Sequence, residues 1–491
     1  MAVSVVDFAK ASRERLLAVP ERLSHIHLLG IGGSAMTAVA GMLVSRGFRV
    51  SGSDVEIYEP AASLLRRLRV EIHKGFDAKN LDPRPDLVVI GNVITAANPE
   101  AAAVLERGIP YLSMPEAVRH FFLKERRVLA VVGTHGKTTS SAMLAHVLSA
   151  CGRDPGMLIG GVALNFDSNW LLGGGPEFVI EGDEYDTAFF DKRPKFLHYH
   201  PWGIILTAVE FDHADIYRDL EHVKGAFRAL ATQLKPDGRV AVCADHPDAL
   251  AVVEQSQARK LTFGLNHGEF RAEGITVGEH GASFWVSRCG ERMAPRFMLP
   301  LWGRMNVVNA LGVVVLAREL GIADADIASA IASFKGVARR QQVVGEAGGV
   351  VVVDDFAHHP TAVKATLAAI VERFPKRRLI VAFEPRSNTS RRRVFQQQFA
   401  SAFDLASHVF LAPVYFKEND PLPVEQRLDV QVLAEEISQR GPRARAMKSN
   451  DELLAAIVEQ AREGDVVVFM SNGPFDNLKY RFLEALKLRA A

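Results

Sequence analysis

Cysteine is scarce in this sequence, which has 3 cysteines among 491 residues. They stand at Cys151, Cys243 and Cys289, and their wide separation fits no metal-binding spacing. So few thiols also argue against a framework of disulfide bonds, which small extracellular proteins use for stability. We therefore expect a reducing, cytoplasmic location.

Long apolar runs and an excess of one charge are also absent. No segment approaches the roughly 20 consecutive apolar residues that a membrane-spanning helix needs. Residues 1–24 lack the apolar stretch of a signal peptide and predict a short surface helix that leads into the fold. The formal net charge is +1, so the charge balance predicts neither a nucleic acid nor a membrane as a partner.

The chain is longer than one hydrophobic core usually serves. Short runs rich in Val and Ile alternate with amphipathic stretches, which is typical of parallel sheets covered by helices. New blocks of strands begin after Arg126-Arg127 and after Arg339-Arg340. We predict an α/β protein with domains at residues 1–125, 126–339 and 340–491. The expected strands are His25–Leu29, Arg49–Ser53, Asp86–Ile90, Val128–Val132, Phe178–Ile180, Gly203–Val209, Val350–Val353, Arg378–Ala382, His408–Leu411 and Asp465–Met470.

The strongest chemical signal follows the apolar run Val128–Val132. The segment Gly133-Thr134-His135-Gly136-Lys137-Thr138-Thr139 connects this run to a predicted helix, Ser140–Ala150. Backbone N–H groups at such a turn bind phosphate, and the aligned peptide dipoles of the helix favour a negative charge there. The Lys137 ammonium suits β- and γ-phosphates, and the Thr138 hydroxyl is placed to bind Mg²⁺. The segment predicts a site for ATP or a related nucleotide.

A second glycine-rich turn, Gly30-Ile31-Gly32-Gly33-Ser34-Ala35, directly follows the strand His25–Leu29. It meets a relaxed dinucleotide-binding pattern, and Asp54 closes the next strand at the distance of a ribose-binding acid. On this segment alone three interpretations stay open. They are NAD binding, a Rossmann-like unit that binds the diphosphate of another nucleotide, and a tight turn between a strand and a helix.

Two acidic segments follow strands downstream of the phosphate loop. They are Glu181-Gly182-Asp183-Glu184-Tyr185-Asp186 and Glu210-Phe211-Asp212-His213-Ala214-Asp215. Each one alone would more often be a solvated turn. Because Mg²⁺ prefers oxygen ligands and α/β folds bind ligands at the carboxyl ends of strands, the two together predict a Mg²⁺ site.

Three more polar segments follow strands in the last third of the chain. Asp354-Asp355-Phe356-Ala357-His358-His359 could bind metal, orient a nucleotide, or cap a helix that begins at Pro360. In Glu384-Pro385-Arg386-Ser387-Asn388-Thr389, Arg386 could bind a substrate carboxylate with both arms of its guanidinium. The third segment is Ser471-Asn472-Gly473-Pro474, and we interpret Arg391-Arg392-Arg393 as a solvated helix face.

Taken in order, these motifs resemble the Mur ligase family, the ATP-dependent ligases of bacterial cell-wall peptide assembly. The resemblance runs from about His25 to Gly473. It implies a Rossmann-like N-terminal domain for a UDP-sugar, a central P-loop-type ATPase domain with a mostly parallel sheet, and a Rossmann-like C-terminal domain for the incoming amine. It also implies ATP and Mg²⁺ as cofactors, and domain closure around ATP.

The resemblance further implies a role for each site residue. Lys137, Glu181 and His213 would be catalytic: Lys137 would steady the γ-phosphate, and Glu181 and His213 would bind a second Mg²⁺ beside the one on Thr138. The remaining ATP-facing residues would be Asn306, Arg340, Asp355 and His358. The UDP-sugar would contact Gly32, Gly33, Ser34 and Asp54, and the carboxylates of a peptide would contact Arg386, Ser387 and Asn388.

Two branches of the family share the Gly-Ile-Gly-Gly start and act on UDP-N-acetylmuramate. One adds L-alanine, and the other attaches the recovered murein tripeptide L-Ala-γ-D-Glu-meso-diaminopimelate. The long segment Glu184–Arg193, Phe356, and the segments Glu384–Thr389 and Met470–Gly473 resemble the tripeptide branch. Pro474-Phe475-Asp476 departs from its glycine-rich continuation. Arg228 lies near the position where several Mur ligases carry a carbamylated lysine, which is similar to the UDP-N-acetylmuramate branches.

The implied reaction converts the lactyl carboxylate of UDP-N-acetylmuramate into an acyl phosphate, which the amine then attacks. Because the phosphoryl group supplies the leaving group, the protein mainly positions the reactants and neutralises charge. Two other classes of protein remain as hypotheses. A nicotinamide oxidoreductase would use the Gly30 turn but leaves the Lys137 loop unexplained, and a nucleotide-gated binding protein would release no phosphate in response to an amine.

Overall fold

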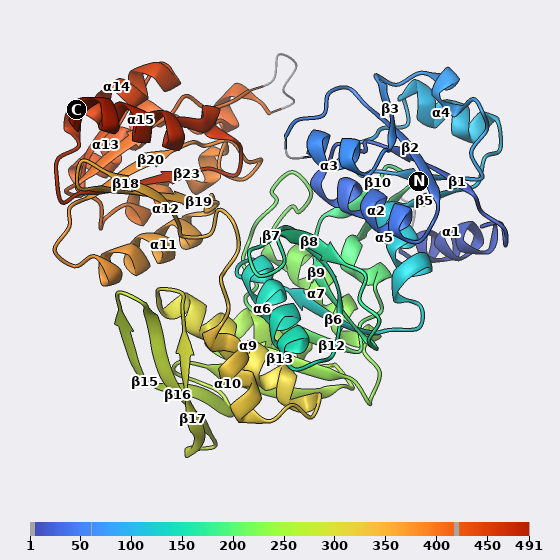
Figure 1. Ribbon diagram of the computed structural model, residues 1–491, viewed down its shortest axis with the longest axis horizontal. Coiled ribbons are helices and arrows are strands. Elements are labelled where there is room, and N and C mark those ends of the chain that lie inside the picture. Colours follow the sequence, from blue (N-terminus) through green and yellow to red (C-terminus); the bar gives the residue numbers. More distant parts are fainter. Residues whose placement is uncertain (1–4, 60, 417–421, 491) are drawn as a thin grey trace. The chain divides into compact units, whose positions relative to one another are not determined.

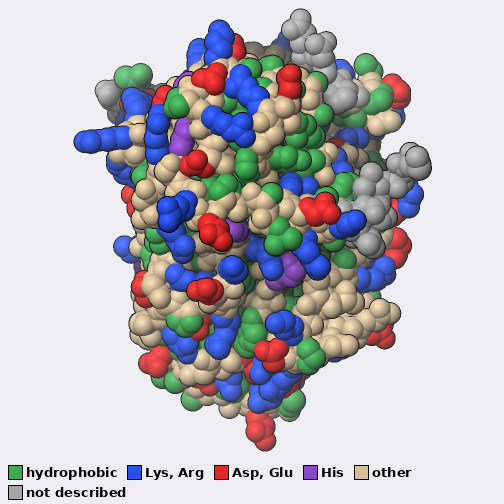
Figure 2. Space-filling view, turned by 90° about the vertical axis from the view of Figure 1, so that its right-hand side faces the viewer, with side chains coloured by type: hydrophobic (Ala, Val, Ile, Leu, Met, Phe, Trp, Pro, Cys, Tyr) green, Lys and Arg blue, Asp and Glu red, His purple; other side chains and the backbone are tan. Residues whose placement is uncertain are grey.

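The structure is a computed structural model that describes residues 5–59, 61–416 and 422–490. It divides into two compact units, which are described separately. Unit 1 comprises residues 1–210, 221–268 and 312–327, and unit 2 comprises residues 211–220, 269–311 and 328–491. Among the described residues, no helix has both the length and the apolar character to cross a membrane. Figure 2 shows basic and acidic side chains interspersed on the face that it draws.

The first sheet of unit 1 is parallel, with the strand order β3-β2-β1-β4-β5 (Figure 1, blue). Its strands are β1 (His25–Leu29), β2 (Arg49–Asp54), β3 (Glu71–Lys74), β4 (Leu87–Ile90) and β5 (Tyr111–Ser113). Its helices are α1 (Val5–Leu17), α2 (Ser34–Ser45), α3 (Ala61–Arg67), α4 (Pro99–Glu106) and α5 (Met114–Val118). The glycine-rich turn lies between β1 and α2, at the carboxyl end of the central strand.

The second sheet of unit 1 has the strand order β14-β13-β12-β6-β9-β7-β8, and β8 alone among them runs antiparallel to its neighbour. The strands are β6 (Arg127–Val132), β7 (Gly156–Ala163), β8 (Ser168–Leu171), β9 (Glu177–Gly182), β12 (Gly203–Leu206), β13 (Arg239–Cys243) and β14 (Arg259–Gly264). Helices α6 (Lys137–Ala150), α7 (Leu220–Gln233) and α8 (Pro247–Val253) belong to the same stretch of chain. A hairpin of β10 (Asp186–Ala188) and β11 (Asp191–Pro194) follows β9, and η3 (Lys195–His198) follows the hairpin.

The sheet in the C-terminal part of unit 2 has the order β18-β19-β23-β20-β21-β22 (Figure 1, orange to red), with only β18 antiparallel. Its strands are β18 (Gln342–Ala347), β19 (Val350–Asp355), β20 (Leu379–Phe383), β21 (His408–Leu411), β22 (Arg443–Ala446) and β23 (Val466–Met470). The helices are α11 (Pro360–Arg373), α12 (Gln396–Ala402), α13 (Val430–Gln439), α14 (Asn450–Gln460) and α15 (Leu478–Ala490).

Successive valines of β19 pack into different cores. Val351 and Val353 pack with side chains of α11, α12 and α13. Val350 and Val352 pack with side chains of α14 and α15. Because neighbouring residues of a strand point to opposite faces, a strand covered on both sides must be apolar throughout. This double burial explains why the Val-rich runs predicted the strands of this sheet.

Unit 2 also contains an antiparallel meander that the sequence pattern did not predict. It consists of β15 (Phe270–Gly278), β16 (Gly281–Arg288) and β17 (Glu291–Leu299), followed by α9 (Arg304–Glu319) and α10 (Asp324–Ala332). Much of β15 and β17 alternates between buried and exposed residues. One face of the meander is therefore exposed to solvent. Its strands lack the continuous apolar runs from which the other strands were predicted.

The segment Pro474-Phe475-Asp476 forms an unusual turn after β23. Phe475, Asp476 and Asn477 have φ angles of +48°, +49° and +52°, although none of them is glycine. The left-handed conformation costs an L-residue roughly 1–2 kcal/mol. Phe475 is buried and packs against Phe469 and Phe482 in the core below α15, so tertiary packing holds the turn in place.

Candidate active site

The phosphate loop connects the buried end of β6 to α6, and two glycines set its path. Gly133 has a φ of +122°, and a Cβ atom there would lie 2.4 Å from Thr207 Oγ1. Gly136 has a φ of +77° and precedes α6 as its N-cap, with no side-chain hydrogen bond that caps the helix. Because no side chain caps the helix, the backbone N–H groups at its N-terminus can bind a ligand. This is the arrangement that binds phosphate.

Lys137, the first residue of α6, has a carboxylate partner, Glu184. Its Nζ donates to the carbonyl oxygen of Gly133 (2.7 Å) and to both carboxylate oxygens of Glu184 (3.0 and 3.1 Å). Burial alone would lower the pKa of Lys137, but the carboxylates of Glu184, Asp183 and Glu181 outweigh burial and raise it. Lys137 therefore carries its positive charge, which suits it to bind phosphate.

Glu181 lies beside the loop because β9 pairs with β6 in parallel, with Glu181 opposite Val131. The Thr138 hydroxyl donates to Glu181 Oε1 (3.0 Å), and Glu181 Oε2 accepts the backbone N–H of Gly160 (2.7 Å). A hydroxyl and a carboxylate in contact are oxygen donors of the kind that Mg²⁺ prefers. The oxygen donors fit the two predicted magnesium ions, one on Thr138 and the second on Glu181, and both ions stay predictions.

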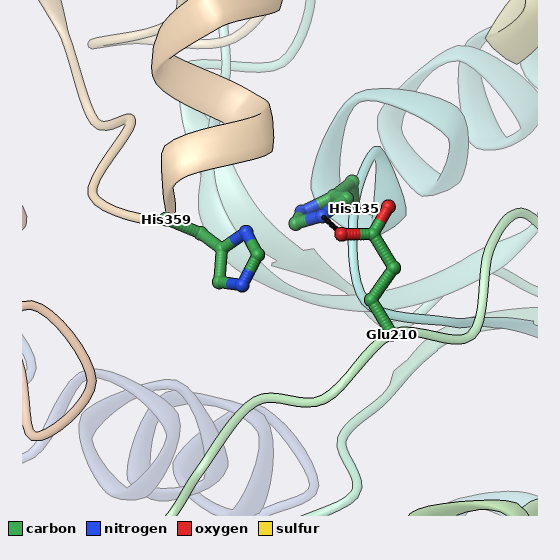
Figure 3. A group of neighbouring side chains, drawn as sticks. All are labelled: His135, Glu210 and His359. Atoms are coloured by element: carbon green, nitrogen blue, oxygen red, sulfur yellow. Dashed lines mark ion pairs between the residues drawn. The ribbon is translucent and has the colours of Figure 1, made fainter. Parts of the chain in front are cut away.

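The loop is also attached to the chain that follows β12. Glu210 forms an ion pair with His135 (3.3 Å; Figure 3). The backbone N–H of Glu210 donates to the Thr134 hydroxyl (2.9 Å), and the Thr134 N–H donates to the Ala208 carbonyl (2.9 Å). These contacts hold the first half of the phosphate loop, and they show why an acid follows β12.

In unit 2, Asp212 organises the segment that carries His213. Asp212 is buried and accepts a hydrogen bond from the Thr389 hydroxyl. Burial would raise its pKa, but His213, His359 and His358 hold it well below the ordinary value of a carboxyl. The backbone N–H of His213 donates to Asp212 Oδ1 (2.6 Å), and His213 has a φ of +54°. Backbone strain of this kind persists where surrounding contacts enforce it, and it is common at functional sites.

Three of the four residues predicted to face ATP from unit 2 lie around Gln341. Asp355 accepts the backbone N–H groups of Gln341 (2.7 Å) and Ala357 (2.7 Å). The Asn306 amide donates to the Gln341 side-chain oxygen (3.1 Å), and the Arg340 guanidinium lies 4.7 Å from the centre of the Phe356 ring. Gln341 itself was not predicted, because its role depends on contacts with distant residues and no motif marks it.

The fourth residue, His358, is half-buried, and desolvation lowers its pKa to about 4. Its imidazole is therefore neutral near pH 7. His358 Nδ1 lies 3.0 Å from the carbonyl oxygen of Phe356. A carbonyl can only accept, so Nδ1 carries the proton and Nε2 is left as the basic nitrogen. This tautomer suits His358 to accept a hydrogen bond.

The alternative interpretation, in which an acid caps the helix at Pro360, is wrong. Helix α11 does begin at Pro360, but its N-cap is His359, also labelled in Figure 3, which forms no side-chain capping bond. Asp355 uses its oxygens for Gln341 and Ala357, and Asp354 contacts Lys479. Asp355 instead connects β19 to the neighbouring loops, and Asp354 connects it to α15.

The loop after β20 places Arg386, Ser387 and Asn388 in different settings. The Arg386 guanidinium lies 4.5 Å from the centre of the Tyr415 ring, and its Nη1 lies 3.5 Å from Glu384 Oε1. Ser387 and Ser390 exchange hydrogen bonds of 2.9 Å between hydroxyl and backbone N–H, and the Asn388 amide donates to Asp215 Oδ2 (2.7 Å). Ser387 and Asn388 thus shape the loop.

Arg391-Arg392-Arg393 is not a helix face. The first two arginines lie in a turn, and only Arg393 enters the short helix η4 (Arg393–Phe395). The α-helix α12 begins three residues after Arg393, at Gln396.

The glycine-rich turn borders a cavity of about 360 Å³ in unit 1. All four residues predicted to contact the UDP-sugar line it: Gly32, Gly33, Ser34 and Asp54. Asp54 Oδ2 accepts the Gly32 N–H (2.9 Å), so this acid also closes the turn. Lys195, which was not predicted, lines the same cavity from η3 and supplies a positive charge.

Three descriptions of protein-family domains match this sequence. The description "Mur ligase family, catalytic domain" matches residues 25–126, "Mur ligase middle domain" matches 131–317, and "Mur ligase, glutamate ligase domain" matches 339–473. The chain is a member of the Mur ligase family. The resemblance and the α/β three-domain architecture predicted from the motifs are thereby confirmed.

Curated relatives of this Mur ligase include members of both branches. The UDP-N-acetylmuramate–L-alanyl-γ-D-glutamyl-meso-2,6-diaminoheptandioate ligase of Escherichia coli is 39% identical over 95% of this chain and 99% of its own length. A UDP-N-acetylmuramate–L-alanine ligase of an Anaeromyxobacter species is 36% identical over 92% of this chain and 95% of its own length.

Solved structures with the same fold also come from both branches. A murein peptide ligase from Psychrobacter arcticus matches with a TM-score of 0.71 and 32% identity, over 94% of this chain and 99% of its own. A UDP-N-acetylmuramate–alanine ligase from Thermotoga maritima matches with a TM-score of 0.78 and 28% identity, over 95% and 100%. The fold therefore does not distinguish the two branches.

Membership establishes the class of reaction of this Mur ligase. Members of the family are ATP-dependent ligases that form an amide bond and release ADP, and they act in peptidoglycan synthesis and recycling. The phosphate loop thus belongs to an enzyme, and the oxidoreductase hypothesis for the Gly30 turn is superseded. Glu181 lies in unit 1 and His213 in unit 2, so the Mg²⁺ site that they would share stays a prediction.

Proposed function

We propose that this Mur ligase joins the tripeptide L-Ala-γ-D-Glu-meso-diaminopimelate to UDP-N-acetylmuramate in the recycling of cell-wall peptide. The similarity to the Escherichia coli enzyme named for this reaction, 39% identical over 99% of that enzyme, carries the proposal. The hairpin β10–β11 gives further support, because it forms the long segment by which the sequence resembles the tripeptide branch. The second candidate is the ligase that adds L-alanine, whose relatives are nearly as similar.

The proposed chemistry has two steps. The lactyl carboxylate attacks the γ-phosphorus of ATP, so that ADP leaves and an acyl phosphate forms. The amino group of the peptide then attacks the acyl carbon, inorganic phosphate leaves, and the nitrogen loses a proton as the amide forms. A carboxylate alone resists amine attack near neutral pH, so the phosphoryl group makes the second step possible. The protein has to position three reactants and neutralise their charge.

Each part of the described site has a task in this scheme. Lys137 exchanges Glu184 for the γ-phosphate and balances the charge that moves to ADP. Thr138 would hold one Mg²⁺, and Glu181 and His213 would hold a second; both ions would supply further neutralisation of the phosphates. Asn306, Arg340, Asp355 and His358 would face ATP from unit 2, where neutral His358 can accept a hydrogen bond.

We assign the two other substrates to separate sites. UDP-N-acetylmuramate would occupy the cavity beside the glycine-rich turn, where Lys195 can balance the diphosphate. The carboxylates of the tripeptide would bind at Arg386 and the loop that Ser387 and Asn388 shape. Domain boundaries near residues 125 and 339 suit this division. The match to the catalytic-domain description ends at residue 126, and the match to the glutamate-ligase-domain description begins at residue 339.

One assay tests the proposal. The purified protein is given ATP, Mg²⁺ and UDP-N-acetylmuramate, and release of phosphate is compared for L-alanine and for the tripeptide. We expect the tripeptide to stimulate release and L-alanine to stimulate it poorly. Efficient use of L-alanine would assign the chain to the other branch, and no stimulation by either amine would refute ligation of UDP-N-acetylmuramate.

A further inference from the structure

Unit 2 contains a second cavity, of about 470 Å³, that none of the predicted site residues lines. Three segments far apart in the sequence border it: 211–218, 392–394 and 425–426. Its volume lies in the range of small-molecule sites in proteins, which is about 300–1,000 Å³. Its lining combines aromatic rings, arginines and one acid, and this combination indicates the chemistry of a ligand.

The aromatic wall of the cavity is fixed by packing. Phe211 stacks on Phe395, with ring centres 6.0 Å apart and planes 20° apart. Tyr217 is buried, and Val394 is 62% exposed. An aliphatic chain placed between these side chains would cover apolar surface that is otherwise open to water.

Two arginines that are consecutive in the sequence, Arg392 and Arg393, line the cavity. Arg392 Nε donates to the Asn388 carbonyl (3.2 Å), and among the described parts of the chain no carboxylate pairs with Arg392 or Arg393. Arg218 also lines the cavity but already contacts Asp219 (2.9 Å). Guanidinium groups that line one cavity favour a carboxylate or phosphate as ligand.

The cavity also contains a negative group. Glu425 lines it from η5 (Val424–Gln426), together with Gln426. A ligand that carried only negative charge would be repelled by Glu425. A ligand with a carboxylate and an ammonium group on one carbon matches both signs, since the arginines and the acid can bind the two groups separately.

The cavity is built on the same segment as the predicted catalytic histidine. Residues 211–218 carry His213, and they are held to the loop after β20 by Asn388, which donates to Asp215 (2.7 Å), and by Thr389, which donates to Asp212. A substrate bound along this loop from Arg386 toward Arg392 would therefore extend from the reacting region to the cavity.

We propose that this cavity binds the distal amino-acid centre of the third residue of the peptide substrate. The distal carboxylate would bind Arg392 and Arg393, the ammonium would bind Glu425, and the methylene groups would lie on Phe211 and Tyr217. The inference rests on the proposed function. The distal centre lies beyond the γ-linkage of D-Glu and a side chain of four more bonds, so at roughly 3.3–3.6 Å per three bonds of extended chain it lies about 15 Å from the reacting amine and needs a site of its own.

The site predicts a preference between two third residues. Diaminopimelate ends in a carboxylate and an ammonium, whereas lysine ends in an ammonium alone. A lysine peptide would leave the two arginines unpaired, and a site built to bind a polar group discriminates strongly against a ligand that lacks it. The wild-type enzyme should therefore have a kcat/KM at least about tenfold higher for the diaminopimelate tripeptide than for the lysine tripeptide.

The test compares three amines, namely the diaminopimelate tripeptide, the lysine tripeptide and the dipeptide L-Ala-γ-D-Glu. In the double variant Arg392→Ala/Arg393→Ala, kcat/KM for the diaminopimelate tripeptide should fall by about tenfold or more, with the two other amines unchanged. Glu425→Gln should lower kcat/KM for both tripeptides and leave the dipeptide unchanged. The matched control is Arg443→Ala/Arg445→Ala, which removes two exposed arginines of β22 from outside the cavity.

The outcomes separate the two proposals. If the wild type uses none of the peptides, the proposed function fails. If it uses the tripeptide but the Arg392/Arg393 variant keeps its preference for diaminopimelate, the proposed function stands and this inference is overturned. Equal losses for the dipeptide and the tripeptides, or an equal effect of the control variant, would overturn it as well. Thermal unfolding of each variant, with the wild-type transition expected, checks that the fold is intact.

Discussion

The ion pair between Lys137 and Glu184 allows a sharp test of how the phosphate loop is kept ready for ATP. We consider the substitution Glu184→Gln, which removes one negative charge and keeps the size of the side chain. The side chains of Lys137 and Glu184 are only 13% and 3% exposed. The substitution therefore leaves a buried ammonium without its main partner in the nucleotide-free protein.

The size of the effect follows from the contacts. Breaking a buried ion pair by removing one partner costs about 3–5 kcal/mol. The glutamine oxygen can still accept a hydrogen bond, and Gly133, Asp183 and Glu181 remain near Lys137. We therefore expect the free energy of unfolding to fall by about 2 kcal/mol without nucleotide. Phosphates neutralise Lys137 in both proteins, so bound ATP should restore most of this loss.

The same difference should appear in the affinity for ATP. Since 1.4 kcal/mol corresponds to a factor of ten, a deficit of about 2 kcal/mol confined to the free protein would strengthen ATP binding about 30-fold. The assay is denaturant unfolding with and without a non-hydrolysable ATP analogue, together with direct titration of the analogue. The control is Glu221→Gln, which alters an exposed pair with Lys224 and should change neither quantity.

One pair of results would refute this reasoning. If Glu184→Gln unfolds at the wild-type denaturant concentration without nucleotide, the pair does not stabilise the free protein. If the analogue then binds with wild-type affinity, Glu184 does not compete with phosphate for Lys137.

Three further predictions concern other parts of the chain. Lys137→Ala should abolish phosphate release in the ligase assay while circular dichroism and thermal unfolding show a folded protein, and retained turnover would contradict the role of the loop. Burial lowers the pKa of His198 to about 4. Between pH 6.5 and 4 the unfolded chain therefore binds a proton that the folded protein does not, and the free energy of unfolding falls by about 3 kcal/mol as the pH falls through this range. Urea unfolding across this range should show a shallower loss for His198→Gln. Asp476→Gly should raise the free energy of unfolding by about 1 kcal/mol, because glycine adopts the left-handed φ without strain. The ion pair of Asp476 with Arg481 is exposed, so its loss should cost little. A lower unfolding midpoint in urea would show that the turn is unstrained.

The sequence predicted those parts of the site that depend on local pattern. A glycine loop between a buried strand and a helix is recognisable in a single segment, so Gly133, Gly136 and Lys137 could be assigned in advance. Glu181 could be assigned as well, because the strand before it is buried on both faces and reads as an apolar run. The meander β15–β17 was missed, because alternating strands with one wet face resemble ordinary surface sequence.

Contacts between distant residues could not be predicted in this way. The ion pair of Lys137 with Glu184 joins residues 47 positions apart, and Asn306 reaches Gln341 across 35 positions. Lys195 enters the cavity beside the glycine-rich turn from another part of unit 1. The packing of whole helices and strands determines such contacts. A local motif contains only one of the two residues in each contact.

The left-handed turn at Phe475, Asp476 and Asn477 bears on how this protein can change over evolutionary time. Valine, isoleucine and threonine are disfavoured at Asp476 and Asn477, because a branched Cβ clashes with the backbone in this conformation. Glycine and asparagine are tolerated there, and a neutral drift between these and aspartate leaves the path of the chain unchanged. A sequence search that requires glycine after Ser471-Asn472-Gly473 would consequently overlook relatives that form the same turn with other residues.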